Sequence, residues 1–217
     1  MAHPPFNPLD KRALGESVAD ALLERRVGPL PPEQSFPGAG IYAIYYTGSF
    51  DLYAPIAERN RNDTHEQPIY VGKAVPEGSR KGGFGLGTAP GNVLYKRLRE
   101  HATSIKVTRD LQLQDFACRY LIADDIWIPL GESLLIERFR PVWNVLVDGF
   151  GNHPTGKPRS KQKRSLWDTL HRGRGWAQRL PPNAVSIEQL RGMVAAFLAG
   201  QPVKTISIQD AVAREED

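Results

Sequence analysis

The chain has 217 residues, 41% of them hydrophobic, and a formal net charge of +4 at pH 7. This length and composition predict one globular domain with elaborations and a sizeable core. The single cysteine, Cys118, excludes an internal disulfide and favours a reducing compartment. No apolar run approaches the roughly 18 residues of a transmembrane helix, and the first residues lack the apolar segment of a signal peptide, so we expect a cytoplasmic protein without a membrane anchor.

Positive charge gathers in one region of the chain. Between residues 150 and 180 there are eight lysines and arginines and one acid, Asp168. A basic stretch beside a nearly neutral remainder is typical of proteins that bind a polyanion such as nucleic acid. Charge alone leaves open the alternative of a solvated surface with no such partner.

The first third of the chain predicts a helix, a linker and two short strands. Residues 8–26 predict the helix, and prolines exclude helix from there to residue 37. The sequences GIYAIYY (40–46) and IYV (69–71) have the β-branched and aromatic residues typical of strands. The polar residues 47–67, with a partly helical pattern, interrupt the two strands.

Residues 75–92 are rich in glycine and show no hydrophobic periodicity, which predicts a long loop. Loops of this length inside compact domains usually have a function or are disordered. The segment contains neither of the glycine patterns that bind nucleotide phosphates after a strand, so we reject a nucleotide site.

The second half of the chain predicts helices around one more strand. Leu94 and Leu98 recur at helical spacing, and Ser186 with Gln189 forms a capping box ahead of a C-terminal helix. The expected elements are a helix at 93–107, a strand at 113–123, a helix at 132–140 ended by Pro141, a short extended segment from residue 142, a basic linker, a short helix at 165–171 and a helix from residue 186.

Two polar side chains share a face of the expected helix 93–107. Arg97 and His101 lie four residues apart, so both project from the same side. That side adjoins the stripe of Leu94 and Leu98. An arginine and a histidine that merely flank core leucines would give the same pattern, so the spacing alone does not establish a site.

Glu132 is unusual for its position in the sequence GESLLIERF. It shares helical spacing with apolar residues three, four and seven positions later, which predicts a face toward the core. A carboxylate there is costly unless it is paired or bound to a metal. The alternative is a place in the first helical turn, where the helix dipole favours acids. Glu137 has Arg138 and Arg140 beside it and is expected in solvent.

Five sequence elements occur in the order found in one nuclease superfamily. They are Gly40-Ile41-Tyr42, Tyr70-Val71-Gly72, Arg97 with His101 four residues later, Glu132 at a helix start, and Pro141 to Asn144. In these elements, over residues 38–150, the chain resembles the GIY-YIG nucleases. Each element also falls on the secondary structure that the family requires of it.

The resemblance implies an α/β (α+β) fold with a small three-stranded antiparallel sheet flanked by helices. Insertions and helical extensions then surround this core. The expected divisions are an N-terminal helix and proline-rich linker at 1–37, the nuclease core at 38–150 with insertions at 47–67 and 75–92, and a basic linker with a C-terminal helical extension at 151–217.

The resemblance also implies metal-dependent cleavage of DNA phosphodiesters. Glu132 would hold one Mg²⁺ ion, or Mn²⁺ in its place, since Mg²⁺ keeps much of its water and needs few protein ligands. Arg97 would neutralise the phosphate. Tyr42 would orient and activate the attacking water with help from Tyr70 and His101, although the roles of the two tyrosines could be exchanged. The catalytic set expected in full is Tyr42, Tyr70, Lys73, Arg97, His101, Glu132 and Asn144.

Insertions within the core and strings such as PIYVGKAVPEG and VWNVLVDGFGNH resemble the type II restriction endonucleases of this superfamily that cut CCGCGG. A palindromic target implies a homodimer on double-stranded DNA, and a restriction enzyme implies a cognate DNA methyltransferase. Basic side chains read guanine well in the major groove, although they bind phosphate equally readily. The candidates are Arg80, Lys81, Arg159, Lys161, Lys163 and Arg164.

Two other interpretations stay open at this point. One is a nuclease of repair or of mobile elements with the same chemistry. The other is a DNA-binding protein that has kept the fold and lost catalysis.

Asn152 and His153 are assigned either to a turn or to the residues that support the site from behind. His171 has no assigned role.

Overall fold

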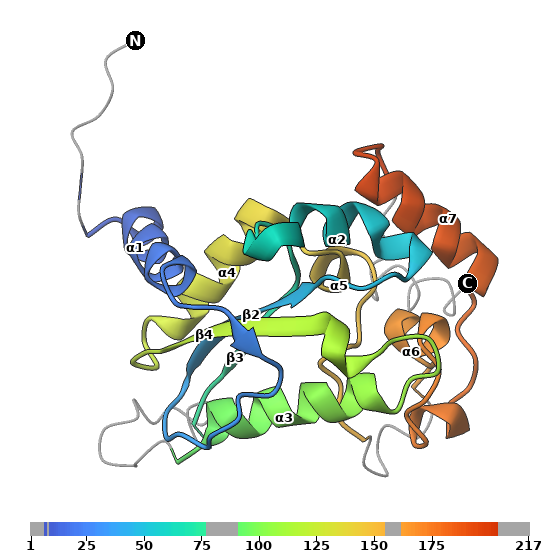
Figure 1. The fold of residues 1–217 in the computed structure, drawn as a ribbon, viewed down its shortest axis with the longest axis horizontal. Helices are drawn as coiled ribbons and strands as arrows, with labels where there is room; N and C mark the ends of the chain where they lie inside the picture. Colours follow the sequence, from blue (N-terminus) through green and yellow to red (C-terminus); the bar gives the residue numbers. More distant parts are fainter. Residues whose placement is uncertain (1–6, 8, 77–90, 155–161, 204–217) are drawn as a thin grey trace, which may run out of the picture.

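A computed structural model describes residues 7, 9–76, 91–154 and 162–203. Its centre is an antiparallel sheet, whose strands in the described part of the chain follow the order β1-β4-β2-β3 (Figure 1). The expected fold class is confirmed, with one strand more than the three expected. The strands are β1 Gly28–Pro29, β2 Gly40–Tyr46, β3 Pro68–Ala74 and β4 Phe116–Ile122.

The additional strand comes from the segment expected to be a linker. Gly28 pairs with Cys118 and Pro29 with Ala117, so β1 extends the sheet beyond β4. Proline has no backbone N–H to donate, and it is therefore tolerated at a sheet edge. The prediction that this proline-rich segment is not helical is confirmed. A strand of two residues is too short to show a periodicity from which it could be predicted.

Strand β2 is the buried centre of the molecule. All seven of its side chains are buried, and successive residues contribute to different clusters on the two faces of the sheet. Tyr42, Ile44 and Tyr46 pack toward α3, whereas the residues between them pack toward α1 and α4 (Figure 1). These helices are α1 Lys11–Leu23, α3 Val93–Lys106 and α4 Ile128–Phe139. In the part of the chain that is described, no helix is long and apolar enough to cross a membrane.

The insertion between β2 and β3 is closed at its base by one side chain. The Asn60 amide donates to the carbonyls of Tyr46 (3.0 Å) and Gln67 (2.9 Å), and its oxygen accepts from the Gln67 N–H. The two strands are therefore joined at the point where the insertion begins and ends. Between them lie η1 Asp51–Tyr53, α2 Ala54–Arg59 and η2 Arg61–Asp63, so the partly helical pattern is confirmed.

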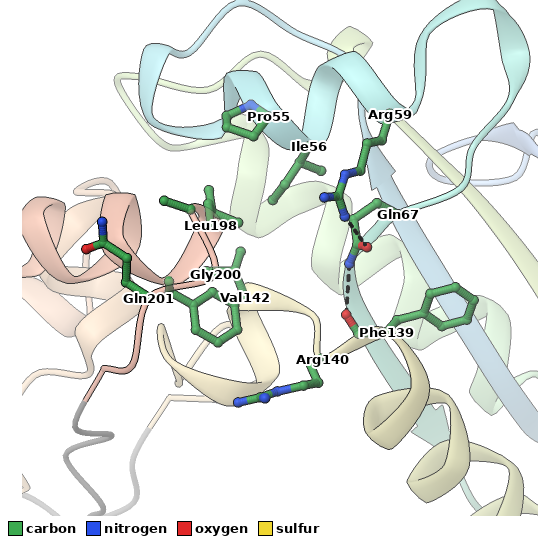
Figure 2. A pocket seen from close by; sticks show the side chains of 12 residues that line it. Pro55, Ile56, Arg59, Gln67, Phe139, Arg140, Val142, Leu198, Gly200 and Gln201 are labelled. Atoms are coloured by element: carbon green, nitrogen blue, oxygen red, sulfur yellow. Dashed lines mark hydrogen bonds between the residues drawn. The ribbon is translucent and has the colours of Figure 1, made fainter.

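Helix α4 begins at Ile128, four residues before the expected start. Glu132 therefore lies beyond the first turn, and this excludes the interpretation that a first-turn dipole alone explains it. The helix ends at Phe139, and Arg140, which caps it with a left-handed φ of 44°, is followed by Pro141. Figure 2 shows the Gln67 amide bonded to the last helical carbonyl, that of Phe139, at 2.9 Å. The cavity of about 420 Å³ drawn there is lined by none of the expected catalytic residues.

The segment after Pro141 is helical, where an extended segment was expected. The Asn144 and Val145 N–H groups both bond to the Pro141 carbonyl, which starts the short helix α5 Val142–Val145. The β-branched valines suggested strand, but Pro141 fixes the chain to begin a turn. The C-terminal helices are α6 Leu166–Leu170, η6 Ala177–Arg179 and α7 Ile187–Leu198, and the capping box of Ser186 and Gln189 is confirmed.

A buried imidazole joins three segments that are far apart in the sequence. His171 follows α6, and its Nε2 lies 2.7 Å from the Tyr53 hydroxyl in the insertion. Its Nδ1 lies 2.8 Å from Asp110, in the connection that leads to β4. The Trp143 indole donates to the same Tyr53 hydroxyl at 2.9 Å. His171 thus has a structural place that its lone position in the sequence did not indicate.

Candidate active site

Gly40 and Gly72, from the first two sequence elements of the family pattern, each allow a close approach. Gly40 makes room for the backbone of β4, and Gly72 makes room for the Tyr42 side chain. Gly40 lies against the Leu121 carbonyl of β4, where an added Cβ would overlap the backbone. Gly72 lies opposite Tyr42 in the sheet, and an added Cβ would be 2.6 Å from Cζ of the Tyr42 ring. The Tyr42 side chain therefore crosses β3 at Gly72, which brings its hydroxyl toward the α3 side of the sheet.

Tyr42 and His101 form a short polar contact in the site. The Tyr42 hydroxyl lies 2.5 Å from Nε2 of His101, and both residues are buried. Burial raises the pKa of Tyr42 well above 10. Burial, reinforced by the charge of Arg97, lowers the pKa of His101 well below 6.5. At neutral pH the phenol is therefore protonated and the imidazole neutral, and in the tautomer that carries its proton on Nδ1 the hydroxyl donates and Nε2 accepts.

Tyr70 completes an aromatic wall around this pair. Its ring centroid lies 6.2 Å from that of Tyr42 and 5.3 Å from that of His101. Burial raises the pKa of Tyr70, while the nearby Arg97 guanidinium lowers it. Phe150 stacks on His101 with a centroid distance of 4.4 Å, and its ring meets Tyr70 edge to face at 4.9 Å.

Arg97 is held by groups that the sequence did not identify. Its Nη2 donates to the Gly151 carbonyl at 2.7 Å. Its Nη1 contacts both Nε2 of His153 and, at 3.2 Å, the carboxylate of Glu100. The turn that contains His153 therefore contacts Arg97 directly. From the sequence, His153 was assigned either to a turn or to the residues that support the site from behind. The only sequence signal was the string GFGNH, in which two glycines allow the backbone to approach closely.

Lys73 and Glu132 form an ion pair on the other side of β3. Nζ of Lys73 lies 2.6 Å from Oε2 of Glu132, and the two side chains are 38% and 18% exposed. Lys73 directly follows Gly72, so it points toward α4 while Tyr42 lies on the α3 side. The charge of Glu132 nevertheless raises the pKa values of Tyr42 and Tyr70. The pair and the tyrosines therefore share one electrostatic environment at the edge strand.

The residues present fit a metal ion that has few protein ligands. Within the described ranges, no group of three or more His, Cys, Asp or Glu side chains could hold an ion. Glu132 supplies one partly exposed carboxylate beside the catalytic side chains. Such a donor suits a hydrated divalent ion of the Mg²⁺ kind, which takes its other ligands from water and phosphate. It does not suit a structural zinc site, which needs a closed set of nitrogen or sulfur ligands.

Asn144 binds the backbone of β3 with both ends of its amide. Its oxygen accepts from the Val71 N–H at 2.8 Å, and its nitrogen donates to the Val71 carbonyl at 2.7 Å. Because β3 lies at the edge of the sheet, these groups have no strand on their outer side. Asn144 therefore acts on the site by holding the residue between Tyr70 and Gly72.

We expect Asn144→Ala to lower stability by about 1–3 kcal/mol, because it removes both partners of a partly buried peptide group. Cleavage of DNA should fall as well, since Tyr70 and Gly72 lose their anchor. Urea unfolding and a cleavage assay on the same preparation would measure both effects. A variant with unchanged stability and no cleavage would instead place Asn144 in direct contact with the reacting groups.

The expected DNA contacts lie largely outside the described residues. This applies to Arg80, Lys81, Arg159 and Lys161. Lys163 and Arg164 are described, and the Arg164 guanidinium donates to the carbonyls of Ala177 and Gln178. An open cavity of about 440 Å³ adjoins Arg97, and its lining includes Lys96, Arg97, Arg99, Glu100, His101, Phe150, His153 and Trp176.

A family comparison agrees with this geometry. The model of the Eco29kI GIY-YIG domain matches residues 34–198, which include the strands β2, β3 and β4, the helix α3 and most of the C-terminal extension. No curated protein matches the chain. The match covers all the residues that form the site, including the turn that holds Arg97. The chain therefore belongs to the Eco29kI GIY-YIG family, a family of type II restriction endonucleases that cut DNA and whose member Eco29kI cuts CCGCGG.

Proposed function

We propose that this protein is a Mg²⁺-dependent type II restriction endonuclease that hydrolyses double-stranded DNA at a GC-rich palindrome such as CCGCGG. The single observation that carries the proposal is the 2.5 Å contact between the Tyr42 hydroxyl and a neutral, buried His101. A phenol that contacts a neutral imidazole can pass its proton to that imidazole and accept another proton in its place. Together with the family match it favours an active nuclease over a DNA-binding protein that has lost catalysis.

Tyr42 and His101 account for activation of the nucleophile. A water molecule that donates to the Tyr42 oxygen gives up its proton as the phenol passes its own proton to Nε2 of His101. The hydroxide attacks phosphorus, and the bond to the leaving 3′ oxygen breaks. Neither residue has to carry charge beforehand, since His101 accepts the phenol proton only as the proton of the water replaces it on Tyr42. Tyr70 contacts both partners and limits where the water can lie.

Arg97 would neutralise the negative charge that builds up on the phosphate during the reaction. Its guanidinium lies close enough to both tyrosines for its charge to lower their pKa values. Charge-assisted hydrogen bonds from a guanidinium stabilise phosphoryl oxygens. Glu100, Gly151 and His153 fix its orientation before substrate binds. The charge is therefore placed in advance, without reorganisation during the reaction.

GIY-YIG nucleases generally use a divalent metal ion, and here Glu132 would hold it, with Mg²⁺ as the natural ion and Mn²⁺ as a substitute. When bound, such an ion polarises the phosphate and stabilises the leaving oxygen. Lys73 neutralises Glu132 in the free protein, so the carboxylate keeps its position until the ion arrives.

The palindrome implies two copies of the site, one for each DNA strand, and thus a homodimer. We also propose a cognate methyltransferase that protects the host sequence. Arg80, Lys81, Arg159, Lys161, Lys163 and Arg164 remain the proposed contacts to DNA.

A cleavage assay on plasmid DNA tests the proposal. Purified protein is incubated at low salt with Mg²⁺ or with EDTA, and the fragment ends are sequenced. We expect discrete fragments that require Mg²⁺ and share one palindromic sequence at their ends. A smear would support a repair or mobile-element nuclease, and binding without cleavage would support the inactive DNA-binding protein. DNA methylated at the identified site should resist cleavage.

A further inference from the structure

A buried ion pair lies in the C-terminal extension, next to the turn that binds Arg97. Nε of Arg174 lies 2.7 Å from one oxygen of Asp168, and Nη2 lies 2.8 Å from the other. The two side chains are 3% and 2% exposed. Trp167 and Trp176 flank the guanidinium, with ring centroids at 4.4 and 5.0 Å. Asp168 is itself held by the Ser165 hydroxyl at 2.7 Å.

Arg174 uses its remaining donors on three backbone carbonyls of a single turn. Nη2 donates to Gly149 at 2.8 Å, and Nη1 donates to Phe150 and Asn152 at 3.1 Å each. Gly149 has a φ of 98° and lies against Ser165, so the turn is fitted closely to α6. One guanidinium therefore sets the path of the chain from Gly149 to Asn152.

The same turn makes three contacts with the catalytic residues. The Gly151 carbonyl accepts from Arg97, His153 contacts the same guanidinium, and Phe150 stacks on His101. Gly151 also approaches closely, since an added Cβ would be 2.8 Å from the Tyr70 hydroxyl and 3.0 Å from Nη2 of Arg97. Any shift of the turn is thus transmitted to Arg97.

An ion pair this deeply buried is weak evidence for stabilisation, because desolvation offsets the attraction between the charges. An apolar pair would fill the same space, but it could not bind three carbonyls in fixed directions. The ion pair is therefore better explained by the path that it gives to the turn 149–152 than by a contribution to the stability of the fold.

We propose that Arg174, oriented by Asp168, is a positioning residue for catalysis: it fixes the turn 149–153 so that Gly151 and His153 hold Arg97 in place for the scissile phosphate. This inference rests on the proposed role of Arg97. Catalysis is sensitive to such placement, since an error of about 1 Å can cost roughly a hundredfold in rate.

Single-turnover cleavage tests the proposal in Arg174→Gln, Arg174→Lys and Asp168→Asn. We expect Arg174→Gln to slow cleavage about 10- to 100-fold while DNA affinity in Ca²⁺ stays within about threefold. Arg174→Lys should recover part of the rate, because a lysine can still pair with Asp168. The matched control is Asp110→Asn, which weakens a different polar contact of the extension, the one between the buried His171 and the partly exposed Asp110 of the connection before β4.

A double-mutant cycle separates positioning from general destabilisation. If Arg174 acts through Arg97, Arg174→Gln should cost no further rate in an Arg97→Lys background, because mutations that act through one group are not additive. Full additivity, or a rate loss that simply follows the unfolded fraction and is matched by Asp110→Asn, would overturn the proposal.

A spectroscopic arm does not depend on cleavage. In protein labelled with ¹⁵N-arginine, the Nε–H signal of Arg97 is identified by its loss in Arg97→Lys. We expect Arg174→Gln to shift or broaden this signal and Asp110→Asn to leave it unchanged. A shifted signal in a protein that fails to cut DNA would disprove the proposed nuclease function but not the linkage, whereas an unchanged signal would disprove the linkage itself.

Discussion

We expect Glu132→Ala to abolish the proposed Mg²⁺-dependent cleavage, with a loss of about 10³-fold or more in single-turnover rate. The reason is that a metal contributes several kcal/mol to stabilising the transition state, and each 1.36 kcal/mol is tenfold in rate. Glu132 is the carboxylate whose charge raises the pKa values of both Tyr42 and Tyr70, and it is the residue proposed to hold the ion. The measurement is fragment formation over time at saturating Mg²⁺.

Glu137→Ala is the matched control, since it removes an acid from the same helix. Glu137 is 61% exposed and pairs with Arg12 on the surface, so cleavage should be unchanged. Mn²⁺ binding, followed by the loss of its free electron paramagnetic resonance signal, should disappear in Glu132→Ala and persist in Glu137→Ala. Retained metal binding in Glu132→Ala would assign the ion to another ligand.

Tyr42→Phe should reduce the cleavage rate by about 10²- to 10⁴-fold, the usual contribution of a positioned acid–base group. The change removes the hydroxyl that links the water to His101 and keeps the ring that packs over Gly72. DNA affinity should change little, because the phenylalanine ring fills the same space. Cleavage would be measured in a single turnover at a fixed Mg²⁺ concentration.

Tyr46→Phe provides the control on the same strand and the same face. Its hydroxyl accepts from the Phe50 N–H, so its loss costs some stability but leaves the site intact. The pH profile adds a second check. Because burial holds the pKa of His101 well below 6.5, the acid limb of the rate should also lie well below that pH. Full activity of Tyr42→Phe in a folded protein would exclude Tyr42 as the group that activates water.

The arrangement of the site follows from the sequence where it depends on short-range pattern. Two tyrosines on adjacent antiparallel strands, and Arg97 four residues before His101 on a helix, determine which side chains can meet. The start of α4 was less predictable, because its N-cap is Trp127, which makes no side-chain capping hydrogen bond. That error mattered, since it made the first-turn explanation of Glu132 look tenable.

Contacts between distant segments could not be predicted in the same way. The turn that holds Arg97 carries no periodicity, and its partners Asp168 and Arg174 looked like ordinary members of a basic stretch. Asn144 matched a family position, but only the fold shows that its amide binds both polar groups of Val71. Tertiary hydrogen bonds of this kind depend on where the chain returns in space, which spacing along the sequence does not reveal.

The imidazole of His171 has a thermodynamic consequence for the whole molecule. It contacts the insertion through Tyr53 and the connection before β4 through Asp110, so the C-terminal extension cannot detach without breaking both contacts of the buried imidazole. Such a coupling makes separate melting of the extension unfavourable. We therefore expect heat to unfold the insertion, the sheet and the extension in a single cooperative transition, in which the catalytic groups lose their order together with the helices that support them.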